Sequence, residues 1–171
     1  MDHRLRIPPD QLRAYSKKYN YGADPNLSHL ELAAKQQGHL TRDQLHELAL
    51  WKSERRAALI LTNDEIFVRE VTGFAFSATH EHSRIGALVL IKGVHFPTAS
   101  VILHFCLDRS YPILDYRAIW SLGLEQPSGY SPEYWCSYTA LCRSLAKKHG
   151  LTVRELDMAL WQSSRENQGE A

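Results

Sequence analysis

The chain has 171 residues, enough for one domain with a substantial hydrophobic core and no need of stabilising disulfides. Hydrophobic residues make up 44% of the chain and charged residues 23%, values typical of a soluble globular protein. The formal net charge of +1 gives no bulk electrostatic case for or against nucleic-acid binding, so any DNA-binding surface must come from a local cluster of basic residues.

The three cysteines, Cys106, Cys136 and Cys142, are too few and too widely spaced for a disulfide framework or a tetrahedral metal site. They predict buried or partly buried thiols in a reducing compartment. Residues 1–4 lead into no apolar segment of a signal peptide, and no run is long enough to span a membrane. We therefore expect a cytoplasmic protein that has no membrane partner.

Local patterns predict helices along the whole chain. Residues 1–9 are predicted to form an N-terminal arm and residues 10–19 a weak helix. Asp24 and Pro25 predict the start of a second helix, because proline suits the first helical position, and Gly38 is a natural end.

The next helix is predicted from a capping box, Thr41 with Gln44 three residues later, and continues to about Leu61. Asn63 is predicted to cap the helix that follows, with Asp64 in its first turn, where an acidic side chain suits the helix dipole.

The middle of the chain is predicted to hold three short helices. Ser83 is expected to cap a helix over 84–90, which leads through a tight turn to a helix over 97–107. A third helix is expected to begin near Asp115 and to end at Gly123.

The last part of the chain is predicted to form two longer helices. Ser131 starts the first, which Gly150 ends, and Thr152 with Glu155 forms a second capping box. Residues 166–171 are polar and are predicted to be a frayed tail.

The predicted fold class is all-α. About nine helices are expected in a globular multi-helix bundle, and no stretch alternates as a strand would. We expect a single helical domain over 1–171, with a helix-hairpin-helix element over 84–107.

The strongest functional signal lies in residues 84–122. This stretch has a Gly-Val turn at Gly93, a Thr-Ala pair at Thr98 that opens an apolar helix, and a Tyr-Pro-Ile-Leu-Asp run that ends at Asp115. It resembles the helix-hairpin-helix DNA glycosylase superfamily of the endonuclease III and adenine glycosylase type, whose signature is a Gly-Val-Gly turn, then Thr-Ala, then an aspartate. The seventeen positions from Thr98 to Asp115 resemble the adenine-specific branch.

The resemblance implies an enzyme that binds double-stranded DNA at the turn, extrudes a nucleotide, and uses Asp115 to stabilise the sugar cation and direct a water. Strand-cutting members carry a lysine where this chain has Pro97, so the resemblance implies a monofunctional glycosylase. His95 replaces the second turn glycine and implies an altered turn or an added phosphate contact. By its local sequence, Asp115 is also a good helix N-cap, and the two roles are compatible.

Cofactor predictions follow from the same comparison. The family's iron–sulfur cluster needs four closely spaced cysteines, which this sequence lacks, so we expect no cluster. The resemblance leaves room for a monovalent cation at the hairpin. His80 and His82 have the spacing of a loop ligand pair, but no third ligand accompanies them, so we predict no metal site.

A second notable run begins at Trp51 and contains three cations. Lys52, Arg55 and Arg56 follow the i, i+3, i+4 spacing of one helix face, and Trp51 can stack on a base or pack in the core beside a solvated basic edge. The DNA-binding candidates are Gly93, His95, Thr98, Lys92, Lys52, Arg55, Arg56 and Arg117, and the base-pocket candidates are Trp51, Tyr134 and Trp135.

Three functional hypotheses remain open from the sequence. The first is a DNA glycosylase-like enzyme that uses Asp115, and the second is a non-catalytic DNA-binding helix-hairpin-helix module. The third is a structural protein whose core only echoes the hairpin. An open cavity beside Asp115 lined by Trp or Tyr favours the enzyme, whereas a filled one favours binding alone.

Overall fold

Helices make up the regular secondary structure of the computed structural model, which describes residues 1–20 and 27–169. Because these ranges contain no strand, the predicted all-α class is confirmed. They contain ten α-helices where the sequence predicts about nine. The elements are η1 (Pro9–Gln11, a 3-10 helix), α1 (Leu12–Lys18), α2 (Ser28–Gln37), α3 (Arg42–Lys52), α4 (Glu54–Ile60), α5 (Glu65–Ser77), α6 (Glu81–Leu88), α7 (Phe96–Cys106), α8 (Tyr116–Ser121), α9 (Pro132–Lys148) and α10 (Val153–Asn167).

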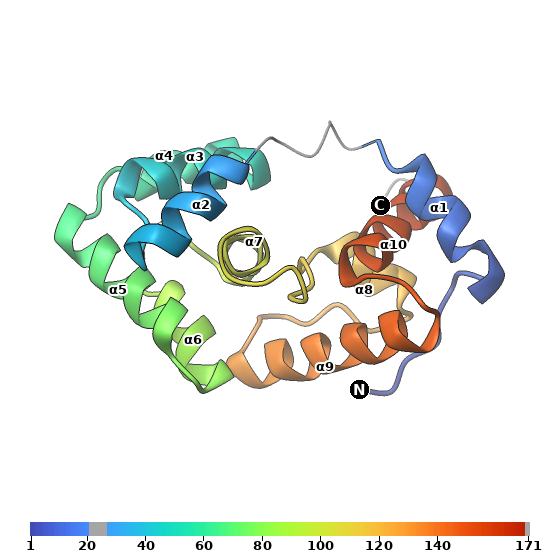
Figure 1. Ribbon diagram of the computed structural model, residues 1–171. Helices are drawn as coiled ribbons and strands as arrows, with labels where there is room; N and C mark the ends of the chain where they lie inside the picture. The colour runs from blue at the N-terminus through green and yellow to red at the C-terminus, as the bar shows by residue number, and fades with distance from the viewer. Residues whose placement is uncertain (21–26, 170–171) are drawn as a thin grey trace.

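Helix α7 lies at the centre of the molecule and is seen almost end-on in Figure 1. Nine of its eleven residues are buried, because its apolar side chains point in every direction instead of forming one stripe. Helices α2 to α6 lie on one side of α7, and α1, α8 and α10 lie on the other, while α9 runs below both groups (Figure 1). A site between the two groups therefore draws on residues that are distant in sequence.

The long helix predicted to run to about Leu61 is divided at Ser53, so its predicted length was wrong. Ser53 has extended backbone angles (φ −165°, ψ 94°) and separates α3 from α4. Lys52 ends α3, whereas Arg55 and Arg56 belong to α4. The three cations therefore do not share one helix face, because no single helix contains them.

The two predicted capping boxes are confirmed. Thr41 with Gln44 starts α3, and Thr152 with Glu155 starts α10. Each threonine hydroxyl accepts the backbone N–H three residues later, and the Gln44 or Glu155 side chain accepts the threonine N–H in return. These motifs are predictable because both partners lie within one turn of chain.

Two other predicted caps are wrong. Asp64, not Asn63, caps α5, and its carboxylate accepts two backbone N–H groups of the first turn. Helix α6 begins at Glu81, so Ser83 lies inside the helix that it was predicted to cap.

The turn between α6 and α7 is fastened to the end of α4 by Asn63. The Asn63 amide donates to the Lys92 carbonyl, and its oxygen accepts the Lys92 N–H, both at 2.9 Å. Gly93 has a positive φ of 97°, and a Cβ there would lie 3.0 Å from the Leu59 Cβ. A helix, a tight turn and a second helix span residues 81–106. The helix-hairpin-helix element predicted over 84–107 stays a prediction.

The N-terminal segment, predicted as an arm, is bonded to the C-terminal end of α8. The backbone N–H groups of Arg4 and Arg6 donate to two carbonyl oxygens there, at 3.1 and 2.8 Å. Gly123 follows α8 with a φ of 68°, and a Cβ on it would lie 2.1 Å from the Arg4 carbonyl oxygen. Ile7 is buried in the core.

Helix α10 runs through Asn167, so the frayed tail predicted over 166–171 was placed too early. The Asn167 amide donates to the Tyr15 hydroxyl at 3.1 Å, which ties this end to α1. The helix start predicted at Asp24 and Pro25 lies outside the described residues.

Replacement of Gly123 by Ala should destabilise the protein by about 1–3 kcal/mol, because the new Cβ would meet the Arg4 carbonyl at a positive φ. Thermal unfolding measures this. Gly86→Ala is the matched control: Gly86 lies in α6 with open space around a Cβ, so alanine should stabilise by about 0.5–1 kcal/mol. Equal effects of the two changes would contradict the close contact.

Candidate nucleic-acid site

A cavity of about 340 Å³ opens beside the ends of α1, α3 and α8, next to α10. We call it the acid pocket, because two aspartates line it. Its lining residues are Tyr19, Trp51, Lys52, Ile113, Asp115, Tyr116, Arg117, Ala118, Arg154, Asp157 and Trp161.

Asp115 caps a helix, as its local sequence predicts, and it also lines the acid pocket. Its Oδ1 accepts the Arg117 N–H at 3.0 Å and caps α8. Its Oδ2 accepts a hydrogen bond from Lys52 Nζ at 2.7 Å. The two side chains are 19% and 15% exposed, so they form a partly buried ion pair at the wall of the acid pocket.

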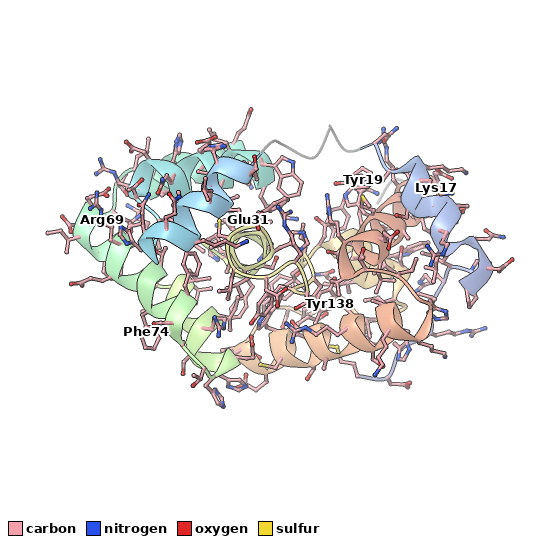
Figure 2. The ribbon with its side chains drawn as sticks, viewed as in Figure 1. Lys17, Tyr19, Glu31, Arg69, Phe74 and Tyr138 are labelled. Carbon is pink, nitrogen blue, oxygen red and sulfur yellow. The ribbon has the colours of Figure 1, made fainter. Side chains whose placement is uncertain are left out.

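The segment 111–114 that delivers Asp115 is positioned by polar side chains of three surrounding helices. Asp157 of α10 accepts the Ile113 N–H at 2.9 Å. The Tyr138 hydroxyl of α9 donates to the Ile113 carbonyl at 3.2 Å. Tyr138 is labelled between α9 and α7 in Figure 2. Ser100 of α7 accepts the next backbone N–H at 2.9 Å. These bonds hold the backbone of Ile113 and Leu114, which leads directly into Asp115.

Asp157 is a second carboxyl of the acid pocket, and the sequence analysis missed it. Its side chain is 4% exposed, and no hydrogen-bond partner is found for its Oδ1 among the described residues. Burial raises its pKa from 3.8 to about 7, against the opposing effects of the Arg154 charge, the Ile113 N–H and the Lys52 charge. The sequence signal that could have identified Asp157 is its place next to Leu156 in a helix whose buried residues include both.

Aromatic rings form much of the remaining wall. Trp51 packs edge-on against Phe105 at 5.3 Å between ring centroids. Tyr19, labelled near the end of α1 in Figure 2, packs edge-on against Trp161 at 5.4 Å, and Arg154 stacks 5.1 Å above the Tyr19 ring. Trp51 was predicted as a pocket residue, whereas Tyr19 and Trp161 were not, because they come from opposite ends of the chain.

The other two predicted base-pocket residues lie away from this cavity. Trp135 is fully buried and stacks on Tyr111 at 6.2 Å, which makes it part of the core. Tyr134 stacks on Tyr138 at 6.4 Å. Neither lines the acid pocket.

A second cavity of about 340 Å³ lies at the start of α7, and we call it the hairpin groove. Its lining residues are Lys52, Ser53, Arg56, His95, Pro97, Thr98 and Tyr130. Lys52 lines both cavities, so they adjoin at its side chain. Partial burial, followed by the charge of Arg56, lowers the pKa of His95, which favours its neutral form.

The predicted DNA-binding residues are thus partly brought together. Four of them meet in the hairpin groove, namely Lys52, Arg56, His95 and Thr98. Arg117 lies instead on the acid pocket, with its guanidinium 5.5 Å from the Trp161 ring centroid. Lys92, Gly93 and Arg55 line neither cavity.

The carbonyl oxygens of the turn bear on the cation that the family resemblance implies. The Ile91 carbonyl accepts the Val94 N–H at 2.9 Å, and the Lys92 carbonyl accepts the Asn63 amide. Each of these two carbonyl oxygens accepts this one hydrogen bond and keeps a further lone pair. In the described ranges, no three His, Cys, Asp or Glu side chains form a possible metal cluster.

Comparisons with protein-family models, with curated proteins and with solved structures each found no match. Within residues 1–20 and 27–169, no helix has both the length and the apolar character to cross a membrane. The two cavities and the residues that line them are therefore the features of the molecule that point to a function.

The raised pKa of Asp157 should make stability depend on pH. The folded state holds this proton more tightly than the unfolded chain, so the stabilisation is complete below about pH 4 and is lost as pH rises through about 7. The difference corresponds to roughly 4 kcal/mol, an upper bound. Asp157→Asn should remove this loss of stability, and urea unfolding at pH 5 and pH 8 measures it. If the variant keeps the same pH dependence, Asp157 is not the source of that dependence.

Proposed function

We propose that this protein is a nucleic-acid enzyme, and specifically a DNA glycosylase that hydrolyses the N-glycosidic bond of an altered or mispaired base. The observation that carries the proposal is the place of Asp115. Its carboxylate lies in a cavity of ligand size, beside aromatic rings, and that cavity adjoins a basic groove at the start of α7.

The hairpin groove is the proposed contact with the DNA backbone. Arg56 and Lys52 supply positive charge beside the N-terminus of α7, where the helix dipole favours an anion. Thr98 and His95 add polar groups at the same helix start. Contacts of this kind position a duplex without reading its sequence.

The acid pocket is the proposed site of the extruded base. Removing a base from the stack costs a few kcal/mol, which stacking on aromatic side chains offsets. Trp51, Tyr19 and Trp161 provide such rings, and Arg154 and Arg117 add cationic planes beside them.

Asp115 is the proposed catalytic residue. Breaking the bond between the base and C1′ develops positive charge on the sugar, which a nearby carboxylate stabilises while it orients a water. Lys52 holds that carboxylate in place at 2.7 Å. Asp157 also lines the pocket, and because burial keeps it largely protonated below about pH 7, it is the proposed proton source for the departing base. Water is the proposed nucleophile at C1′, because Pro97 stands where strand-cutting members of the resembled family carry a lysine.

The alternative, a binding module without catalysis, uses the hairpin groove alone. The open cavity beside Asp115 supports the enzyme, because a module that only binds the backbone has no need of a buried aromatic pocket with two carboxyls.

Asp115→Asn should slow base release by about 100-fold or more while DNA affinity stays near that of the wild type. Asparagine is also a good N-cap, so α8 should persist. A panel of labelled duplexes, each with one altered or mispaired base, measures release as abasic-site formation. Asp108→Asn, a carboxylate outside both cavities, is the control. Undiminished release by the Asp115 variant would remove it from the catalytic role.

Arg56→Ala should weaken duplex binding, and the slope of log affinity against log salt should fall in magnitude by about 0.9 for one lost phosphate contact. Arg55→Ala is the matched comparison on the same helix and should have the smaller effect, because Arg55 lies outside the hairpin groove. Fluorescence anisotropy at several salt concentrations measures both. Equal slopes for the two variants would contradict the groove as the DNA contact.

A further inference from the structure

A third cavity, of about 540 Å³, lies between α5 and α6, and we call it the α5–α6 groove. Phe67, Val71 and Phe74 line its α5 side at the i, i+4, i+7 spacing of one helix face. Gly86 of α6 and Leu90, two residues after α6, line the other side. No lining residue of this groove lines the acid pocket or the hairpin groove, so it is a separate surface.

The large apolar side chains of the α5–α6 groove are left in contact with water. Phe67 is 37% exposed, Phe74 is 53% exposed and Leu90 is 67% exposed. Figure 2 shows Phe74 on the outer side of α5, away from the central helix α7. Single exposed apolar side chains are ordinary on protein surfaces, whereas several that share one hollow are typical of a surface that binds a partner.

Gly86 is a second sign that something lies in this groove. It sits inside α6 without a positive φ, and a Cβ there would meet no atom within 4 Å. Neither the backbone nor the packing of this chain therefore requires glycine, although glycine weakens a helix relative to alanine. What the glycine does provide is a deeper groove and an α6 backbone that another molecule can approach closely.

Glu70 gives the α5–α6 groove its charge. It is the one charged residue among those that line the groove, and it lies between Phe67 and Phe74 along α5. Its neighbour Arg69 is paired with Glu65 instead, and no ion pair or hydrogen bond engages the Glu70 carboxylate within residues 1–20 and 27–169. A molecule that covers the groove takes water from this carboxylate, so it must supply a cation in return.

This requirement distinguishes between the possible occupants. A second copy docked about a two-fold axis through the middle of the groove brings each Glu70 close to its own counterpart, and two carboxylates repel. An anionic membrane surface attracts lysine and arginine, whereas this groove offers a carboxylate. The groove therefore favours a different protein, one that presents apolar side chains together with a cation.

We propose that the α5–α6 groove is a docking site for an amphipathic helix of a partner protein, with a lysine or arginine beside its apolar stripe to face Glu70. A groove between two helices accepts the side-chain ridge of a third helix. The apolar α5 wall from Phe67 to Phe74 is about 10 Å long, which matches two turns of such a helix. This inference does not depend on the proposed glycosylase activity.

The test uses the full chain to select from a displayed library of helical peptides of about 18 residues. Leucines are fixed at i, i+4 and i+7, and the positions beside them are randomised. The wild-type protein should enrich lysine or arginine at one position beside the leucines. Glu70→Lys should enrich aspartate or glutamate at that same position, because the charge facing it is reversed.

The most enriched peptide, made synthetically and labelled, then measures the groove by fluorescence anisotropy. Gly86→Leu should weaken binding by about 10-fold or more, because the new side chain fills the groove, whereas the fold persists because leucine is a good helix former. Phe74→Ala should weaken binding to a similar extent. Leu32→Ala is the matched control, since Leu32 is an equally exposed apolar residue of α2 outside the groove, and it should bind as the wild type does.

Three results would overturn the inference: no peptide enriched above background, the same charge preferred by the wild type and Glu70→Lys, or binding that Gly86→Leu leaves unchanged. Sedimentation and vesicle binding test the other occupants. A dimer that Gly86→Leu abolishes would assign the groove to a second copy, and binding to phosphatidylserine vesicles that Phe74→Ala abolishes would assign it to a membrane. Either outcome would also overturn the partner helix.

Discussion

The ion pair between Lys52 and Asp115 is the contact on which the arrangement of the site depends. It joins residues 63 positions apart, the last residue of α3 and the N-cap of α8, from the two groups of helices that flank α7. Its hydrogen bond fixes the orientation of the carboxylate, while the break at Ser53 ends α3 so that the lysine is its last residue. Both cavities adjoin at the Lys52 side chain, so in the proposed enzyme binding and chemistry would share one support.

The two carboxyls of the acid pocket differ because their surroundings differ. Asp115 accepts hydrogen bonds from the Lys52 side chain and from the Arg117 backbone N–H. Asp157 is fully enclosed, and burial raises its pKa to about 7. In the proposed enzyme, Asp115 would stabilise positive charge and Asp157 would hold a proton, the division of roles that paired catalytic carboxyls use. This arrangement costs stability, because the buried Asp157, with a pKa of about 7, ionises near neutral pH.

Prediction from the sequence worked best where one turn of chain contains all the partners. The threonine capping boxes at Thr41 and Thr152 were correct, because side chain and backbone partners are three residues apart. Asn63 was misassigned, because its amide is used by the turn at Lys92, 29 positions away. Asp115 was predicted as a helix N-cap from its local sequence and as a catalytic residue from a family resemblance, whereas its partner Lys52 was assigned to a DNA-binding face.

The sequence by itself determined the all-α class, most helix boundaries and Asp115 as the residue to examine, because capping, proline and glycine signals act locally. Only the tertiary structure decided which residues line the pocket. Trp135 went to the core, while Tyr19, Asp157 and Trp161 came to the cavity wall. The physical reason is that packing around α7 brings chain ends together, and no local spacing encodes which distant side chains will face one another.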